Sequence, residues 1–308
     1  MVSGPGSAPI ERTALSRMED RISFLYIERA VLNRDGNALT ILDSRGVCHV
    51  PATSIAVVLL GPGTKVTYAA MALLGDAGVS AVWTGEKGVR YYAHGRPPAK
   101  SAAMAIAQAE IVTNQRRRLE CARAMYQMRF PGEDVSHLTM AQLRGREGAR
   151  MKRVYTAESK RTGVYWNRRS YDPNDFDSSD PINQALTTAN AALYGIAHAV
   201  IVGLGFNPAL GVVHTGTDRA FVYDIADLYK AEIAIPAAFD AVASQSFDVQ
   251  VRKLVRDQVV EKRLMQRMVK DLLVLMRVEG ADNLEAELML WSELEVIAAG
   301  VNWDYAGE

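Results

Sequence analysis

Residues 182–205 read INQALTTANAALYGIAHAVIVGLG, and this stretch decides the fold of the larger part of the chain. When it is drawn as a helix, apolar residues fall on most of its faces, which is typical of a helix buried in a core. Asp180 is suited to cap the start of this helix, because Pro181 follows at the first helical position. A helix that is apolar on most faces needs neighbours to cover it. We therefore expect it to lie inside a helical domain.

The sequence on both sides of this core helix is also helical in character. Residues 102–130 have helical periodicity and end at Pro131-Gly132, which predicts one long helix. Residues 143–161, LRGREGARMKRVYTAESKR, predict another helix, and the polar stretch 172–181 predicts a loop. After a segment rich in Pro and Gly, residues 221–236, FVYDIADLYKAEIAIP, continue the helical region.

The first part of the chain has a different pattern, with short apolar runs separated by turn residues. Strands are expected in ISFLYIERAVL, NALTIL, VCHV, SIAVVLL, SAVWTG and GVRYYAHG, and one helix in residues 64–78. The fold class is therefore α+β, with a small, sandwich-like N-terminal β-sheet domain and a larger, mainly helical domain. The expected division is a flexible arm at 1–20, the β-rich domain at 21–95, a proline-containing linker at 96–101 and the helical domain at 102–308.

Composition limits the classes of protein that this chain can belong to. The chain has 308 residues, 49% of them hydrophobic, which suits two folded domains. Its first residues lack the basic and apolar regions of a signal peptide, and its sequence offers no run of about 20 uninterrupted apolar residues for a membrane span. Cys48 and Cys121 lack the paired spacing of a zinc site or a disulfide framework, so we expect a reducing cytoplasm.

The charges balance over the whole chain but not along it. Residues 116–169 hold fourteen Lys and Arg against five Asp and Glu, and residues 252–277 hold eight against three. Residues 279–308 hold eight carboxylates and no Lys or Arg. One basic run by itself is most simply a solvated helix face. Two such runs favour a polyanionic partner, because a local positive potential attracts phosphates even when the net charge is zero.

Four residues could carry chemistry. Asp224 and Asp227, at i and i+3 among apolar residues, place two carboxylates on one helix face. Such carboxylates either form ordinary caps and ion pairs or share a hard cation such as Mg²⁺ or Mn²⁺. His214 lies in a glycine-punctuated turn, and Glu147 lies among arginines, so each also has a plain structural interpretation. The common nucleotide, zinc-protease, esterase and dinucleotide motifs are absent from the sequence, which leaves phosphate chemistry.

Three segments, taken together, resemble one family. LRGREGARMKRVY (143–155), INQALTTANAALYG (182–195) and GVVHTGTDRAFVYDIADLYK (211–230) resemble the CRISPR-associated integrase, the first-numbered protein of CRISPR adaptation, in its subtype I-E branch. The resemblance implies that Glu147, His214 and Asp224 bind Mg²⁺ or Mn²⁺, with Asp227 as a further catalytic residue. It also implies an endonuclease and integrase that joins the 3′-hydroxyl ends of captured DNA to the CRISPR repeat.

The same resemblance implies partners and contacts. The expected partners are double-stranded DNA with 3′ ends, CRISPR repeat DNA, a second copy joined through the β-rich domains, and a bridging dimer of the second-numbered CRISPR-associated protein. Two kinds of side chain are expected to touch DNA, with core or rim packing as the alternative for the tyrosines. They are Arg90, Arg252 and Arg256, and Tyr171, Tyr194 and Tyr223.

Two departures from the family pattern stand out. Glu28 falls where the subtype has an aromatic wedge at the duplex end, although Tyr26 lies two residues away on the same strand face. The acidic C-terminal stretch, which includes LMLWSELEVI, lacks the expected proline-rich tail and could be an amphipathic helix or a surface for a partner. Two other functions stay open: a metal-dependent nuclease that resolves branched DNA, and a non-catalytic DNA scaffold.

Overall fold

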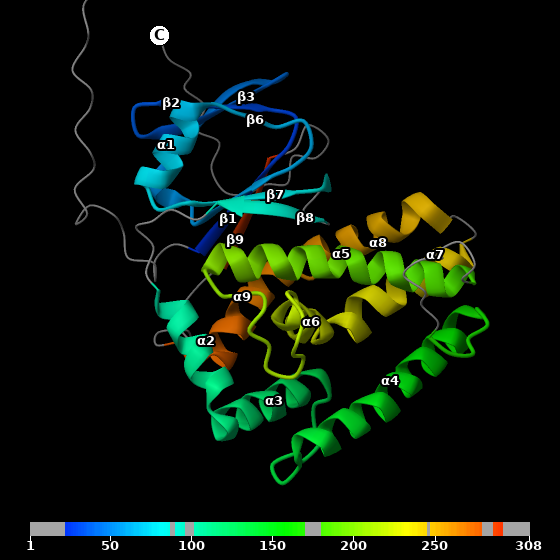
Figure 1. Ribbon diagram of the computed structural model, residues 1–308. Helices are drawn as coiled ribbons and strands as arrows, with labels where there is room; N and C mark the ends of the chain where they lie inside the picture. Colours follow the sequence, from blue (N-terminus) through cyan, green and yellow to red (C-terminus); the bar gives the residue numbers. More distant parts are fainter. Residues whose placement is uncertain are drawn as a thin grey trace, which may run out of the picture. The chain divides into compact units, whose positions relative to one another are not determined.

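The computed structural model describes residues 22–86, 90–95, 102–169, 180–244, 247–278 and 286–291. It divides into two compact units, a strand-rich one and a helical one (Figure 1). The expected α+β class, with an N-terminal β-sheet region and a helical domain, is confirmed. The expected arm at 1–20, the linker at 96–101 and most of the loop at 172–181 lie outside the described residues.

The strand-rich unit has two sheets, with strand orders β8-β7-β5-β1-β9 and β4-β3-β2-β6. In the first sheet β1 pairs in parallel with β5 on one side and with β9 on the other. Both sheets and α1 contribute to one apolar core, which includes Leu25, Leu32, Leu39 and Leu73. The elements are β1 (Ile22–Ile27), β2 (Val31–Asp35), β3 (Ala38–Asp43), β4 (Gly46–Pro51), β5 (Val57–Leu60), β6 (Lys65–Val66), α1 (Tyr68–Asp76), β7 (Ser80–Thr84), β8 (Tyr91–Gly95) and β9 (Ala286–Trp291), with a 3₁₀ turn at Ala52–Ser54.

The predicted strand ISFLYIERAVL is two strands in the structure. The chain turns between β1 and β2 at Arg29, whose φ of 52° lies in the left-handed region that side chains rarely adopt. Glu28, just before this turn, is 2% exposed and accepts a hydrogen bond from the Tyr26 hydroxyl at 2.7 Å. Tyr26 is itself 1% exposed. Neither side chain is therefore presented as a wedge for the end of a DNA duplex.

The end of the described chain returns to the first sheet. Ala286–Trp291 forms β9, which runs parallel to β1 with Ile22 paired to Ala286 and Ile27 to Trp291. The assignment of the whole range 102–308 to the helical domain is therefore wrong for Ala286–Trp291. The first four residues of LMLWSELEVI lie in this strand and not in an amphipathic helix, and the rest of that stretch lies outside the described residues. The sequence contained no signal for this, because a strand's partner is chosen by long-range pairing and not by local pattern.

The helical unit is built around α5 (Pro181–Leu204), the core helix expected from its composition (Figure 1). The Asp180 side chain accepts from the Asn183 amide, and Gly205, with a φ of 92°, ends the helix. α5 contacts α6, α7, α8 and α9. The elements are α2 (Ala103–Thr113), α3 (Gln115–Arg129), α4 (Met140–Thr162), α6 (Ala220–Asp227), a π-helical turn (Lys230–Ala234), α7 (Ile235–Ala243), α8 (Phe247–Glu261) and α9 (Leu264–Leu275).

Two features of this unit refine the sequence interpretation. The single helix predicted over 102–130 breaks between α2 and α3, because the Asn114 side chain accepts from the amides of Arg116 and Arg117 and so caps a new helix.

Among the described helices, α5 alone is long and apolar enough to cross a membrane by length and composition. The most apolar 18-residue segment of α5 is 72% buried inside the structure, as expected of a core helix.

Candidate active site

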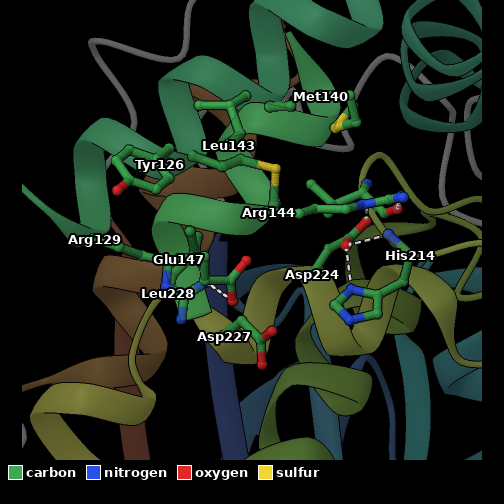
Figure 2. A pocket seen from close by; sticks show the side chains of 13 residues that line it. Tyr126, Arg129, Met140, Leu143, Arg144, Glu147, His214, Asp224, Asp227 and Leu228 are labelled. Carbon is green, nitrogen blue, oxygen red and sulfur yellow. Dashed lines mark hydrogen bonds and ion pairs between the residues drawn. The ribbon is translucent and has the colours of Figure 1, made fainter. Parts of the chain in front are cut away.

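Four side chains that the sequence singled out line one cavity in the helical unit (Figure 2). Glu147 comes from α4, His214 from the loop before α6, and Asp224 and Asp227 from α6 itself. Apolar and basic residues complete the lining, among them Tyr126, Leu143 and Arg144. The interior volume is about 30 Å³, which holds a metal ion or a water molecule but no nucleotide. A larger substrate must therefore lie across the opening.

Asp224 does not face the cavity as a free carboxylate. Its side chain is fully buried and accepts from three successive backbone amides, at 2.5 Å from Val212, 3.1 Å from Val213 and 2.9 Å from His214. It also hydrogen-bonds the His214 Nδ1 at 2.7 Å. Both oxygens are thus engaged by the protein. This arrangement holds the loop in place and leaves Nε2 as the ring nitrogen available to a ligand.

Glu147 and Asp227 each carry a basic partner. Arg129 Nη1 lies 2.6 Å from Glu147 Oε1, and Lys230 Nζ lies 2.5 Å from Asp227 Oδ1. Lys230 begins the π-helical turn, a rare element that is frequent at functional sites. Burial disfavours the charge on Lys230, but Asp227 and Tyr194 more than offset it, so the pKa of this amine is raised. Both carboxylates are therefore charge-compensated without a metal.

The predicted ligand set of Glu147, His214 and Asp224 does not converge on one point. Within the described residues, no three His, Cys, Asp or Glu side chains stand close enough together to hold a metal ion, and this applies equally when Asp227 takes the place of Asp224. The reason is local. Backbone amides and His214 occupy the Asp224 carboxylate, Arg129 pairs with Glu147, and Lys230 pairs with Asp227. Asp227 shares the cavity with Glu147 and His214, and its contact is with one flexible amine (Figure 2).

The tyrosines expected at DNA lie in a small aromatic cluster. The Tyr194 and Tyr223 rings meet edge to face at 5.0 Å, and Tyr223 meets the His214 ring in the same way at 5.8 Å. Lys230 Nζ lies 4.8 Å from the Tyr194 ring centre. Burial raises the pKa of the Tyr194 hydroxyl. In the structure, Tyr194 and Tyr223 therefore pack against other side chains, which is the alternative to DNA contact. The Tyr223 ring also packs against the His214 ring. Tyr171 lies outside the described residues.

The three arginines expected at DNA differ in their surroundings. Arg90 precedes β8 and is exposed, and Arg252 in α8 is exposed as well. Arg256, one turn further along α8, has a side chain only 16% exposed, and its Nε donates to Asp257 at 3.1 Å. The spacing of four residues therefore does not give two equivalent phosphate contacts on this helix.

Three supports of the site were not anticipated from the sequence. Gln108, fully buried in α2, donates to the carbonyls of Asn207 and Leu210 and accepts from the Asn207 amide. Arg118 Nε donates to the Val212 carbonyl at 2.7 Å, and Arg144 Nη2 donates to the Val213 carbonyl at 2.5 Å. The sequence contained a signal for the first of them only, because Gln108 is a lone glutamine in the apolar stretch AAMAIAQAEI.

Comparison with known proteins places this chain in a family. The chain matches the family described as CRISPR associated protein Cas1 over residues 24–132 and 133–272. The chain belongs to the Cas1 family. A CRISPR-associated endonuclease Cas1 of a Clostridium species is 46% identical over 96% of this chain and all of its own length.

A further relative and a solved structure support the same assignment. A CRISPR-associated endonuclease Cas1 of Thermus thermophilus is 40% identical over 99% of this chain and 93% of its own length. A crystal structure of a TtCas1-DNA complex aligns with a TM-score of 0.80 and 44% identity, over 85% of this chain and 99% of that one. The strand-rich and helical units are thus those of Cas1 proteins.

The pH dependence of stability gives a test of the His214 contact. Its hydrogen bond to Asp224 raises the pKa of His214 above the ordinary value of about 6.5, against the opposing effect of burial. A raised folded-state pKa stabilises the protein fully below about pH 6.5 and loses that effect as pH rises through the folded pKa. In metal-free protein, the urea midpoint of wild type relative to His214→Gln should therefore be higher at pH 5.5 than at pH 8.5. A difference that does not change with pH would contradict this contact.

DNA binding gives a test of the difference between the two arginines of α8. Arg252→Ala should weaken binding and lower the slope of log affinity against log salt by about one, because one exposed phosphate contact is lost. Arg256→Ala is the matched control, one turn away, and should leave that slope unchanged. Fluorescence anisotropy over a salt series measures both. Equal slope changes in the two variants would show that the burial of Arg256 does not decide its role.

Proposed function

We propose that this Cas1 family protein is a CRISPR adaptation integrase of the subtype I-E kind, a divalent-metal-dependent endonuclease that joins captured DNA 3′ ends to the repeat. The observation that carries the proposal is the meeting of two carboxylates and one imidazole in one cavity, contributed by α4, the 211–219 loop and α6. A nuclease or an integrase needs such a set, because a phosphodiester carries negative charge that must be stabilised during transfer.

The donor types suit Mg²⁺ or Mn²⁺, and binding would require Glu147 and Asp227 to leave their contacts with Arg129 and Lys230. Glu147 and Asp227 offer hard carboxylate oxygens, and His214 offers an imidazole Nε2 whose opposite nitrogen is held by Asp224. We propose these three as the ligands, with Asp224 as the positioning residue behind His214 and not as the ligand expected from the sequence. Bound there, the metal would polarise the phosphoryl oxygen and stabilise the departing 3′ oxygen.

The chain's own residues supply the rest of the chemistry. Arg129 and Lys230 neutralise the two carboxylates in the structure, and a divalent cation held there would take over that role. The aromatic cluster of Tyr194 and Tyr223 fixes the position of the His214 ring. Because the cavity is too small for a nucleotide, the scissile phosphate would lie across its opening.

The remaining assignments follow from the family and form part of the proposal. They are a cytoplasmic protein, a homodimer joined through the strand-rich units, and a bridging dimer of the second-numbered CRISPR-associated protein. DNA as the partner is supported by the similar structure described as a TtCas1-DNA complex. The exposed Arg90 and Arg252 suit contacts with phosphates.

One assay separates the three candidate functions. The protein is incubated with Mn²⁺ and a branched DNA that carries a labelled free 3′-hydroxyl, and the products are resolved on a denaturing gel. A longer labelled strand shows joining and supports the integrase. Shorter strands without joining would replace it with the branched-DNA nuclease, and DNA binding without either product would favour the scaffold.

A further inference from the structure

The loop that carries His214 has almost no backbone support of its own. Between α5 and α6 the chain forms neither helix nor strand, and residues 212–216 make none of the described backbone–backbone hydrogen bonds. The loop also folds tightly on itself, since a Cβ at Gly211 would come within 2.3 Å of the His214 carbonyl oxygen. The position of His214 must therefore be set by side chains from elsewhere in the unit.

Those side chains hydrogen-bond both the amides and the carbonyls of the loop. Asp224 accepts from the amides of residues 212–214, while Arg118 and Arg144 donate to the carbonyls of residues 212 and 213. The two consecutive peptide groups that join residues 212–213 and 213–214 are thus each held by Asp224 at the amide and by an arginine at the carbonyl. These hydrogen bonds involve charged groups, which are the stronger class.

Arg144 connects two elements that each carry a proposed ligand. It lies on α4 three residues before Glu147, so its guanidinium links the helix that carries Glu147 to the loop that carries His214. Arg144 and Val213 are 69 positions apart in the sequence, and the contact is 2.5 Å long. Figure 2 shows Arg144 reaching from α4 to the loop beside His214 and Asp224.

We propose that Arg144 is a positioning residue that fixes the separation of Glu147 and His214 through the Val213 carbonyl, and thereby sets the affinity of the cavity for a divalent cation. The proposal rests on the proposed metal function of this cavity. A residue that orients a ligand from behind typically changes metal affinity by about 10- to 100-fold when it is removed. Arg118 holds the neighbouring carbonyl but comes from α3, so it steadies the loop without tying it to Glu147.

The first readout uses metal-free protein. Hydrogen exchange of the amides of residues 212–214 is measured in Arg144→Met, Arg144→Lys and the matched control Arg153→Met. Arg153 is an exposed arginine on the same helix. Exchange should be faster in Arg144→Met and closer to wild type in Arg144→Lys, which keeps a donor, while Arg153→Met should match wild type. An Arg144 that touched only DNA phosphates would leave these amides unchanged.

The second readout is the binding of Mn²⁺ without DNA, measured by calorimetry. Arg144→Met should bind about tenfold more weakly than wild type, and Arg153→Met should bind equally well. If wild type binds Mn²⁺, Glu147→Gln does not, and Arg144→Met matches wild type in both readouts, the positioning role is overturned while the proposed function stands. If wild type itself binds no Mn²⁺, the proposed metal function fails. If the amides of residues 212–214 also exchange at the wild-type rate in Arg144→Met, the proposed effect of Arg144 on the loop is rejected as well.

Discussion

Asp224→Ala is expected to lower the free energy of unfolding by on the order of 3 kcal/mol and to abolish DNA cleavage and joining. The carboxylate accepts from the amides of residues 212–214 and from His214 Nδ1, and none of these amides has another described partner. Leaving a buried donor unpaired costs about 1–3 kcal/mol. The sequence alone predicts a loss of activity with an intact fold, because it treats Asp224 as a metal ligand. Urea unfolding in the presence of a chelator measures the difference.

His214→Ala is the matched control for this prediction. It removes the imidazole contact but leaves the three backbone amides bonded to Asp224, so it should cost only about 1 kcal/mol. Activity should be lost in both variants, since each disturbs the proposed ligand His214. If the two substitutions destabilise the metal-free protein equally, the backbone bonds of Asp224 do not hold the loop.

Glu147→Gln is expected to slow metal-dependent DNA cleavage and joining by on the order of 10³-fold while the protein still folds and binds DNA. Loss of one carboxylate ligand removes several kcal/mol of charge stabilisation from the phosphoryl transfer. DNA binding should be equal to or stronger than that of wild type, because a negative charge is removed and Arg129 loses its partner. Product formation is followed at several Mn²⁺ concentrations, together with anisotropy for binding.

Glu133→Gln is the control for charge alone. Glu133 is also an acidic residue that pairs with arginines of α4, Arg146 and Arg150, but it does not line the cavity. Its substitution should leave the rate within about twofold of wild type, as expected for a pair outside the cavity. A comparable loss in both variants would mean that the acidic charge around α4, and not a ligand at Glu147, supports the reaction.

The sequence by itself determined most of the architecture of this protein. The apolar periodicity of α5, its Asp180 cap and its terminal glycine are local properties, and they predicted a buried helix that the structure confirms. The change from short strands to helices likewise predicted the two kinds of unit. The motifs around Glu147, His214 and Asp224 also sufficed to indicate the family, because residue identity and spacing are themselves sequence properties.

Tertiary structure alone decided which residue does what. β9 joins the first sheet through pairing with β1, a strand from the opposite end of the described chain, which no local pattern specifies. Asp224 and Asp227 are equivalent in the sequence, one helical turn apart. The loop of residues 211–219 packs against one of them and not the other, so Asp224 becomes its support and Asp227 is left at the cavity. The sequence located the carboxylates, but only packing distinguished the one that holds His214 from the one proposed to bind the metal.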